Sequence, residues 1–168
     1  VQNILCLTGD GVQAGDQPQA KPVFDFDSTS LLNCIRTMRD EGRFLSGRKL
    51  TTRPNVFLGA AANPFVPPFE WRGVHIVKKI IARAHCIQTQ YCYDVPLLKQ
   101  FMEKVRENRL HEKAFFLIGV GPLPSAKTGR WMKNNVPGVH IPEPVLERIE
   151  KAKDQKAEGK QLCIDLIQ

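Results

Sequence analysis

Four short apolar runs alternate with stretches of helical periodicity, and this alternation restricts the fold more than any other feature of the chain. The runs occupy residues 3–8, 55–60, 86–91 and 114–120. Apolar runs of this length, bounded by turn residues, are typical of strands that are buried on both faces of a parallel sheet. Because strand–helix–strand connections are right-handed, the sequence predicts a parallel βαβ array.

Amphipathic helices are expected between and after these strands. Their ranges are 30–41, 71–84, 95–108, 125–134, 142–152 and 158–168. Asp27 or Ser28 is placed to cap the first helix, and Gly42 is placed to end it. The segment 11–28 is rich in Gly, Pro, Gln and Asp and is too long for a tight turn, so it is predicted to be a functional loop over the strand ends.

The number of strands and the length of the chain together predict an incomplete barrel. The chain has 168 residues, 42% of them hydrophobic, which is enough for one core, so residues 1–168 are treated as one domain. A complete (β/α)8 TIM barrel takes about 250 residues. A chain that opens on a buried strand and stops inside a helix is therefore expected to be a segment of a larger protein, with about four βα units of an α/β barrel.

Composition argues for a soluble, cytoplasmic, metal-free protein. The sequence has no run of about 18 apolar residues and no signal-peptide pattern at its beginning. The five cysteines form no CxxC pair, are odd in number and lie in apolar stretches, as expected of buried thiols in a reducing compartment. The four histidines show no ligand spacing, so no structural metal is predicted.

The net charge of +7 suits several kinds of anionic partner. Lysine and arginine are scattered along the predicted helices, and no aromatic-interleaved basic stripe or nucleic-acid motif accompanies them. The charge therefore favours an anionic cofactor or substrate over nucleic acid, and no membrane partner is expected.

Asp10 is the first residue of the chain that indicates a site. It follows Gly9, which ends the first apolar run, so its carboxylate is expected at the carboxyl end of the first strand. Ligands of α/β folds bind at this edge, which makes Asp10 a candidate functional residue. The alternative is a turn-forming or helix-capping aspartate, because Asp favours such positions regardless of function.

Several motifs, in their order along the chain, resemble the methylenetetrahydrofolate reductase family. They are NILCLTGD at 3–10, GDQPQAK at 15–21, TQYCYD at 89–94 and VHIP at 139–142. The resemblance covers nearly the whole chain and starts at about the family's fourth barrel strand. No single motif is decisive, and the order and spacing make the match specific.

This resemblance implies a flavin-containing (β/α)8 barrel that reduces 5,10-methylenetetrahydrofolate to 5-methyltetrahydrofolate. The implied cofactor is FAD, with FMN as the alternative, and the electrons would come from NAD(P)H or another donor. A folate substrate is implied, together with a homo-oligomer or a partner redox subunit. The family's general acid, a glutamate on the first strand, has no counterpart in these residues.

The resemblance also assigns roles to individual residues. Gly9 and Asp10 match the family's pair beside the flavin and the folate, where a carboxylate can stabilise a cationic iminium formed from the folate. Gln90 matches the glutamine that binds the pterin, since an amide offers both a donor and an acceptor. Lys79 matches a lysine at the cofactor's phosphate or ribityl chain. The alternative for Gln90 is a solvent-facing strand end, which its polarity alone makes the less favoured interpretation. For Lys79, composition alone favours a helix-surface lysine.

Other positions are less faithful to the family pattern. Asp27 and Ser28 fall where the family contacts the adenosine side of the cofactor, but they serve equally well as a helix cap. Asn63 lies in a flavin-binding loop where many members have tyrosine, and Pro67 stands where they have histidine. Thr8 replaces an arginine that could bind phosphate bidentately, which puts the usual FAD contacts in question.

Three classes of function therefore compete at the level of sequence. A reductase predicts bound flavin and folate binding. A non-catalytic folate-binding or electron-transfer scaffold subunit predicts folate binding without flavin. A basic nucleic-acid-binding module predicts steeply salt-dependent binding to DNA or RNA.

Overall fold

The computed structural model describes residues 1–17 and 19–168, and Pro18 of the predicted loop lies outside the described residues. The strands are β1 (Asn3–Cys6), β2 (Phe57–Ala62), β3 (Cys86–Tyr91) and β4 (Phe115–Gly119). The α-helices are α1 (Ser28–Arg36), α2 (Arg72–Ile81), α3 (Val95–Glu107), α4 (Ala126–Asn135), α5 (Glu143–Glu150) and α6 (Gln155–Ile167). Short helical turns occupy Val12–Ala14, Thr37–Glu41 and Leu110–Glu112.

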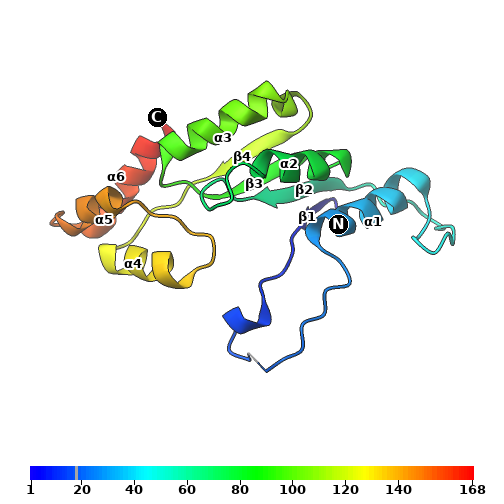
Figure 1. Cartoon of the computed structure of the whole chain (residues 1–168), viewed down its shortest axis with the longest axis horizontal. Helices are drawn as coiled ribbons and strands as arrows, with labels where there is room; N and C mark the ends of the chain where they lie inside the picture. The colour runs from blue at the N-terminus through cyan, green and yellow to red at the C-terminus, as the bar shows by residue number, and fades with distance from the viewer. Residues whose placement is uncertain (18) are drawn as a thin grey trace.

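The four strands form one parallel sheet in the order β1-β2-β3-β4. Helices follow β1, β2 and β3, so each crossover is a βαβ unit (Figure 1). The predicted α/β class, a partial (β/α)8 barrel, is confirmed. All strands end at the same edge of the sheet, which is the edge where ligands bind in such folds.

The main core lies between one face of the sheet and the helices α1, α2 and α3. Alternate strand residues point toward the helices, because successive side chains of a strand lie on opposite faces. The largest fully buried side chains of this cluster are Leu32, Leu58, Ile76, Ile87 and Val105.

The opposite face of the sheet is open, which corrects the prediction that the strands are buried on both faces. Leu5 and Leu7 are exposed at the β1 edge, and Phe115 and Leu117 of β4 are 71% and 53% exposed. The physical reason is that helices cover only the outside of a barrel, whereas its inner face is filled by the other strands of a closed barrel. The apolar runs therefore reflect a barrel interior and not a second helical layer.

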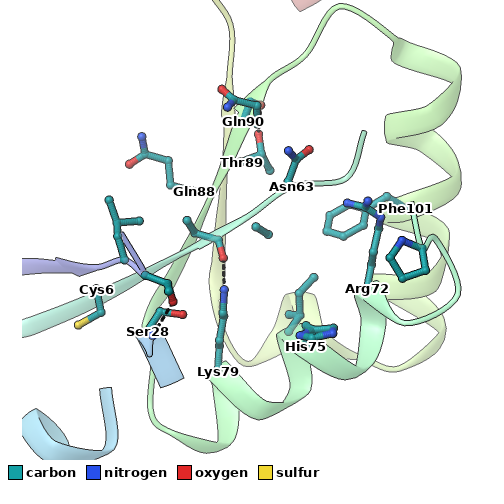
Figure 2. Close-up of a pocket in the computed structure, with 16 residues that line it drawn as sticks. Cys6, Ser28, Asn63, Arg72, His75, Lys79, Gln88, Thr89, Gln90 and Phe101 are labelled. Carbon is teal, nitrogen blue, oxygen red and sulfur yellow. Dashed lines mark hydrogen bonds between the residues drawn. The ribbon is translucent and has the colours of Figure 1, made fainter. Parts of the chain in front are cut away.

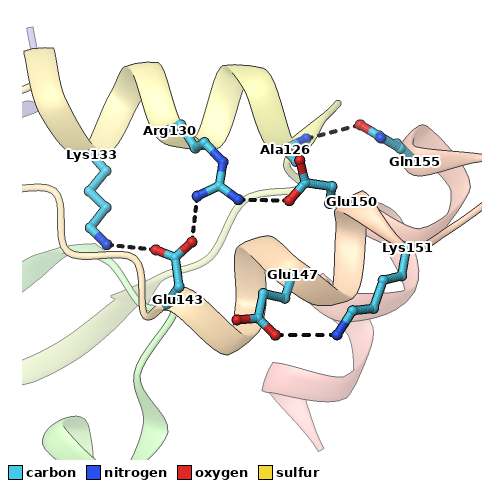
Figure 3. Close-up of polar contacts among 8 residues, drawn as sticks. All are labelled: Ala126, Arg130, Lys133, Glu143, Glu147, Glu150, Lys151 and Gln155. Carbon is cyan, nitrogen blue, oxygen red and sulfur yellow. Dashed lines mark hydrogen bonds and ion pairs between the residues drawn. The ribbon is translucent and has the colours of Figure 1, made fainter.

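Helices α4, α5 and α6 form a second group on the side where β3 and β4 end (Figure 1). Their own apolar cluster includes Leu123, Ile141, Leu146, Ile149 and Leu162. Polar contacts join the helices at the surface: Arg130 of α4 pairs with Glu143 and with Glu150 of α5, the latter at 2.7 Å (Figure 3). Gln155, the first residue of α6, accepts a hydrogen bond from the Ala126 N–H at the start of α4.

Helix ends follow the predicted signals in part. Asp27 caps α1 in a capping box, in which Asp27 Oδ1 accepts from the Ser30 N–H at 2.6 Å and Ser30 Oγ accepts from the Asp27 N–H at 2.8 Å. The predicted helix 30–41 ends as an α-helix at Arg36 and continues as a wider π-turn over Thr37–Glu41, before Gly42 stops it at φ 66°. Among the described residues, none of the helices combines the length and the apolar character needed to cross a bilayer.

Candidate functional site

A cavity of about 450 Å³ opens where β1, β2 and β3 end, beside α2. Four of the predicted site residues line it: Ser28, Asn63, Lys79 and Gln90. Figure 2 shows that Arg72, His75 and Lys79 reach the cavity from one helix, whereas the glutamines come from a strand. The size suits a small-molecule ligand or part of a cofactor.

One wall of the cavity is basic. Arg72, His75 and Lys79 are spaced three and four residues apart on α2, so they lie on one face of the helix. The Arg72 Nε is buried and has no hydrogen-bond partner among the described residues, and its guanidinium lies 5.1 Å from the centre of the Phe69 ring. Burial lowers the pKa of Arg72 from its ordinary value, although the group stays charged at neutral pH. A buried, unpartnered donor of this kind is complementary to an anion.

Lys79 lies deepest in this wall. Its Nζ donates a hydrogen bond to the Ala61 carbonyl of β2 at 2.5 Å (Figure 2). Burial lowers the pKa of the ammonium, and the negative charge of Asp27 partly opposes this shift. The lysine is therefore a hydrogen-bond donor at the wall of the cavity, not on the helix surface.

Amide side chains face the cavity from β3. Gln88 and Gln90 are two residues apart and so share a face of the strand. The Gln90 Oε1 accepts from the Tyr91 N–H at 2.9 Å, which leaves its amide N–H groups for a ligand. Asn63, by contrast, has both ends engaged with backbone: its Nδ2 donates to the Gly138 carbonyl at 2.7 Å and its Oδ1 accepts from the Phe65 N–H at 3.0 Å.

The structure does not bring Gly9 and Asp10 into the cavity. Both are exposed and lie in the irregular segment that follows β1, and neither lines the cavity wall. Thr8 does line it, and its Oγ1 accepts a hydrogen bond from the Ser28 N–H at 2.8 Å. Thr8 therefore joins the end of β1 to the start of α1.

Asp27 acts as a helix cap and does not line the cavity. The hydrogen bond from the Ser30 backbone N–H lowers the pKa of Asp27 from its ordinary value of 3.8. Its carboxylate therefore stays ionised and adds negative charge near Lys79.

Sequence reasoning missed Arg72, His75 and Gln88. The signal for Arg72 and His75 was present in their helical spacing with Lys79. The signal for Gln88 was its spacing of two residues from Gln90, which places both side chains on one face of the strand. No group of three or more His, Cys, Asp or Glu side chains placed to hold a metal ion occurs in residues 1–17 and 19–168.

Comparison with known proteins identifies the family of this chain. The family model for methylenetetrahydrofolate reductase matches the chain over residues 1–168. The chain belongs to this family. No curated protein sequence matches this family member.

This reductase-family chain is also similar to a solved structure. That structure is of an uncharacterised protein from Clostridium thermocellum that binds two copies of 5-methyl-5,6,7,8-tetrahydrofolic acid. The two share 21% sequence identity with a TM-score of 0.52. The match covers 69% of this chain and 41% of the other, so the chain spans less than half of that protein's length. At this identity the likeness shows a shared fold.

Proposed function

We propose that this chain forms the flavin- and folate-binding part of an enzyme that reduces 5,10-methylenetetrahydrofolate to 5-methyltetrahydrofolate. Family membership supports the reaction, and the cavity lies at the strand ends where barrel enzymes hold their ligands. The folate-binding neighbour of the same fold supports a folate ligand. The single observation that carries the proposal is the basic wall formed by Arg72, His75 and Lys79.

The basic wall fits the phosphate of a flavin nucleotide. FAD and FMN both carry phosphate, and the buried Arg72 Nε and the Lys79 ammonium are charged donors that could satisfy its oxygens. The flavin, when bound, supplies the hydride that reduces the folate, with electrons from NAD(P)H or a partner redox subunit. Thr8 is engaged with Ser28, so the phosphate contacts would come from α2 in place of the end of β1.

The remaining roles concern the folate. Gln90 and Gln88 present amides that can pair with the alternating donors and acceptors of a pterin edge. Asp10 is proposed to approach the reacting carbon–nitrogen bond and to stabilise the positive charge that develops there. Because Asp10 is exposed outside the cavity wall, this role requires the segment after β1 to move toward the cavity on binding.

A second candidate function is a folate-binding scaffold without flavin. It is favoured by the fact that two positions where the chain departs from its family, Thr8 and Asn63, are both engaged in internal hydrogen bonds. In this case the amides of β3 would bind folate, and the basic wall would bind the carboxylates of the same molecule.

The visible absorption spectrum of the protein purified from its full-length gene tests the proposal. A flavin spectrum that bleaches when 5-methyltetrahydrofolate is added without oxygen is expected of the reductase. Lys79→Met should lose the flavin colour, whereas Lys78→Met, an exposed neighbour on α2, should keep it. Asp10→Asn should keep the colour and bleach more slowly.

Other outcomes separate the two candidates. Colourless protein that still binds 5-methyltetrahydrofolate would support the scaffold. Protein that binds neither flavin nor folate would contradict both.

A further inference from the structure

A second cavity, of about 660 Å³, lies at the end of the sheet opposite to the first. Its charged lining comes from Arg39 and Asp40 after α1, from Arg83 after α2, and from Lys113 before β4. The imidazole of His85, just before β3, also lines it. Ile80 and Ile81 form an apolar flank. Nothing in the proposed reductase function uses this end of the sheet.

The hydrogen bonds of His85 fix where its proton lies. Its Nδ1 accepts from the Leu58 N–H at 2.9 Å, so in the neutral ring the proton is on Nε2. Burial and the charge of Arg39 lower the pKa of His85, against a smaller opposing effect of Asp40, which favours this neutral form. The Nε2–H is thus a donor that faces the cavity side of the ring.

In the part of the chain that the structure describes, this donor lies beside a second donor and has no acceptor. The Nε2 atom of His85 lies 3.2 Å from the Nη1 atom of Arg39, which can only donate. The rest of the Arg39 guanidinium is already paired: Nε at 2.6 Å and Nη2 at 3.2 Å donate to Asp40, and Nη1 donates to the Val56 carbonyl at 3.3 Å, which leaves one Nη1–H toward His85. Two converging donors beside a cavity are satisfied when an anionic oxygen binds between them.

Arg83 adds a positive charge to the second cavity, and its backbone has a conformation that is unfavourable for residues other than glycine. Its φ of 66° lies in the left-handed region that favours glycine at a helix end. Hydrogen bonds from the Arg83 and Ala84 N–H groups already satisfy the last carbonyls of α2, so the helix end needs no arginine side chain. Neither Arg83 nor Lys113 has a carboxylate within 4.0 Å in the described part of the chain. Strained backbone of this kind is concentrated at functional sites.

We propose that the second cavity binds an oxyanion, a phosphate or carboxylate group of a small molecule, between His85 Nε2–H and the Arg39 guanidinium. Arg83 and Lys113 supply the additional positive charge, and Ile80 and Ile81 contact the apolar part of the ligand. The site is separate from the flavin and folate cavity and does not depend on the function proposed for it.

The test is a titration of the purified protein with sodium phosphate or with citrate, at ionic strength held constant with sodium chloride. The ring resonances of His85 are followed by NMR. A saturable shift is expected, and comparison of the two anions tells whether phosphate or carboxylate is preferred. Arg83→Gly should weaken the apparent affinity by about tenfold, because one charged contact is lost. This variant relieves the backbone strain, so it is expected to fold.

Two further variants make the result specific. Arg109→Gly is the matched control: Arg109 has a similar backbone at φ 52°, pairs with Glu112 and lies outside the cavity lining, so the affinity should not change. Lys79→Met removes a charge from the first cavity and should also leave the affinity unchanged. An unchanged affinity in Arg83→Gly, a loss of binding in Lys79→Met, or no saturable shift with either anion would overturn the proposal.

Discussion

At the scale of single residues, His85 makes stability depend on pH. Its pKa is lowered from the ordinary 6.5 by burial and by Arg39, with a smaller opposing effect of Asp40. The unfolded chain therefore binds a proton more readily than the folded chain as the pH falls below about 6.5. The free energy of unfolding should be highest above this pH and should decrease as the pH falls from 6.5 toward 5.

The variant His85→Asn tests this pH dependence. Asn keeps an acceptor for the Leu58 N–H but does not titrate, so its free energy of unfolding should vary less between pH 7 and pH 5 than that of the wild type. Urea unfolding at several pH values measures the difference. Parallel pH curves for the two proteins would contradict the prediction.

A second residue-scale prediction concerns Gly159 of α6. A Cβ added there would lie 1.8 Å from the Leu123 carbonyl oxygen, so backbone must move. Gly159→Ala should lower the free energy of unfolding by about 3 kcal/mol, the upper end of the usual cost of overpacking.

Gly73→Ala is the control for this change. A Cβ at Gly73 has no neighbour within 4 Å, so alanine in α2 should be neutral or stabilising by up to about 1 kcal/mol. Chemical unfolding measures both variants. Equal changes in the free energy of unfolding would contradict the close packing of α6 on Leu123.

At the scale of elements, Asp27 should act on stability through the start of α1. Asp27→Ala removes the capping box and should cost about 1 kcal/mol, whereas Asp27→Asn keeps a capping oxygen and should cost much less. Thermal unfolding of the two variants distinguishes a contribution of the capping hydrogen bond from a contribution of the carboxylate charge. If both lost stability equally, the carboxylate charge and not the cap would be responsible.

The elements themselves were largely predictable, because each depends on local periodicity. β3 was predicted with its observed bounds, and Asp27 and Gly42 gave the ends of the first helical segment. The π-turn over Thr37–Glu41 was not predicted, since its apolar spacing does not differ enough from that of an α-helix.

The candidate site was only partly predictable from the sequence. The resemblance to the family indicated Lys79 and Gln90, which line the cavity, and Asp10, which does not. Arg72 was missed because its burial depends on how α2 packs near Phe69, and a sequence pattern does not contain this information.

At the scale of the whole molecule, the open face of the sheet should govern behaviour in solution. It exposes Leu5, Leu7, Phe115 and Leu117, and within residues 1–17 and 19–168 the outer edges of β1 and β4 pair with no other strand. Exposed apolar faces and open edges promote association. These 168 residues should therefore associate as concentration rises, which sedimentation velocity can measure.

Leu117→Lys should reduce this association, because it places a charge on the open face, at the outer strand β4. Val74→Lys is the control for this change. Val74 is exposed on α2, away from the open face, so this substitution should have little effect on association. A monodisperse wild-type monomer across the concentration range would contradict the prediction.

The hydrogen bond between Lys79 and the Ala61 carbonyl has a consequence for selectivity. This hydrogen bond uses one of the three N–H donors of the ammonium and leaves two for a ligand oxygen. Because the ammonium is already partly satisfied by a carbonyl dipole, a neutral ligand gains less from the remaining donors than an oxygen with a full negative charge does. The cavity should therefore discriminate between ligands by their charge.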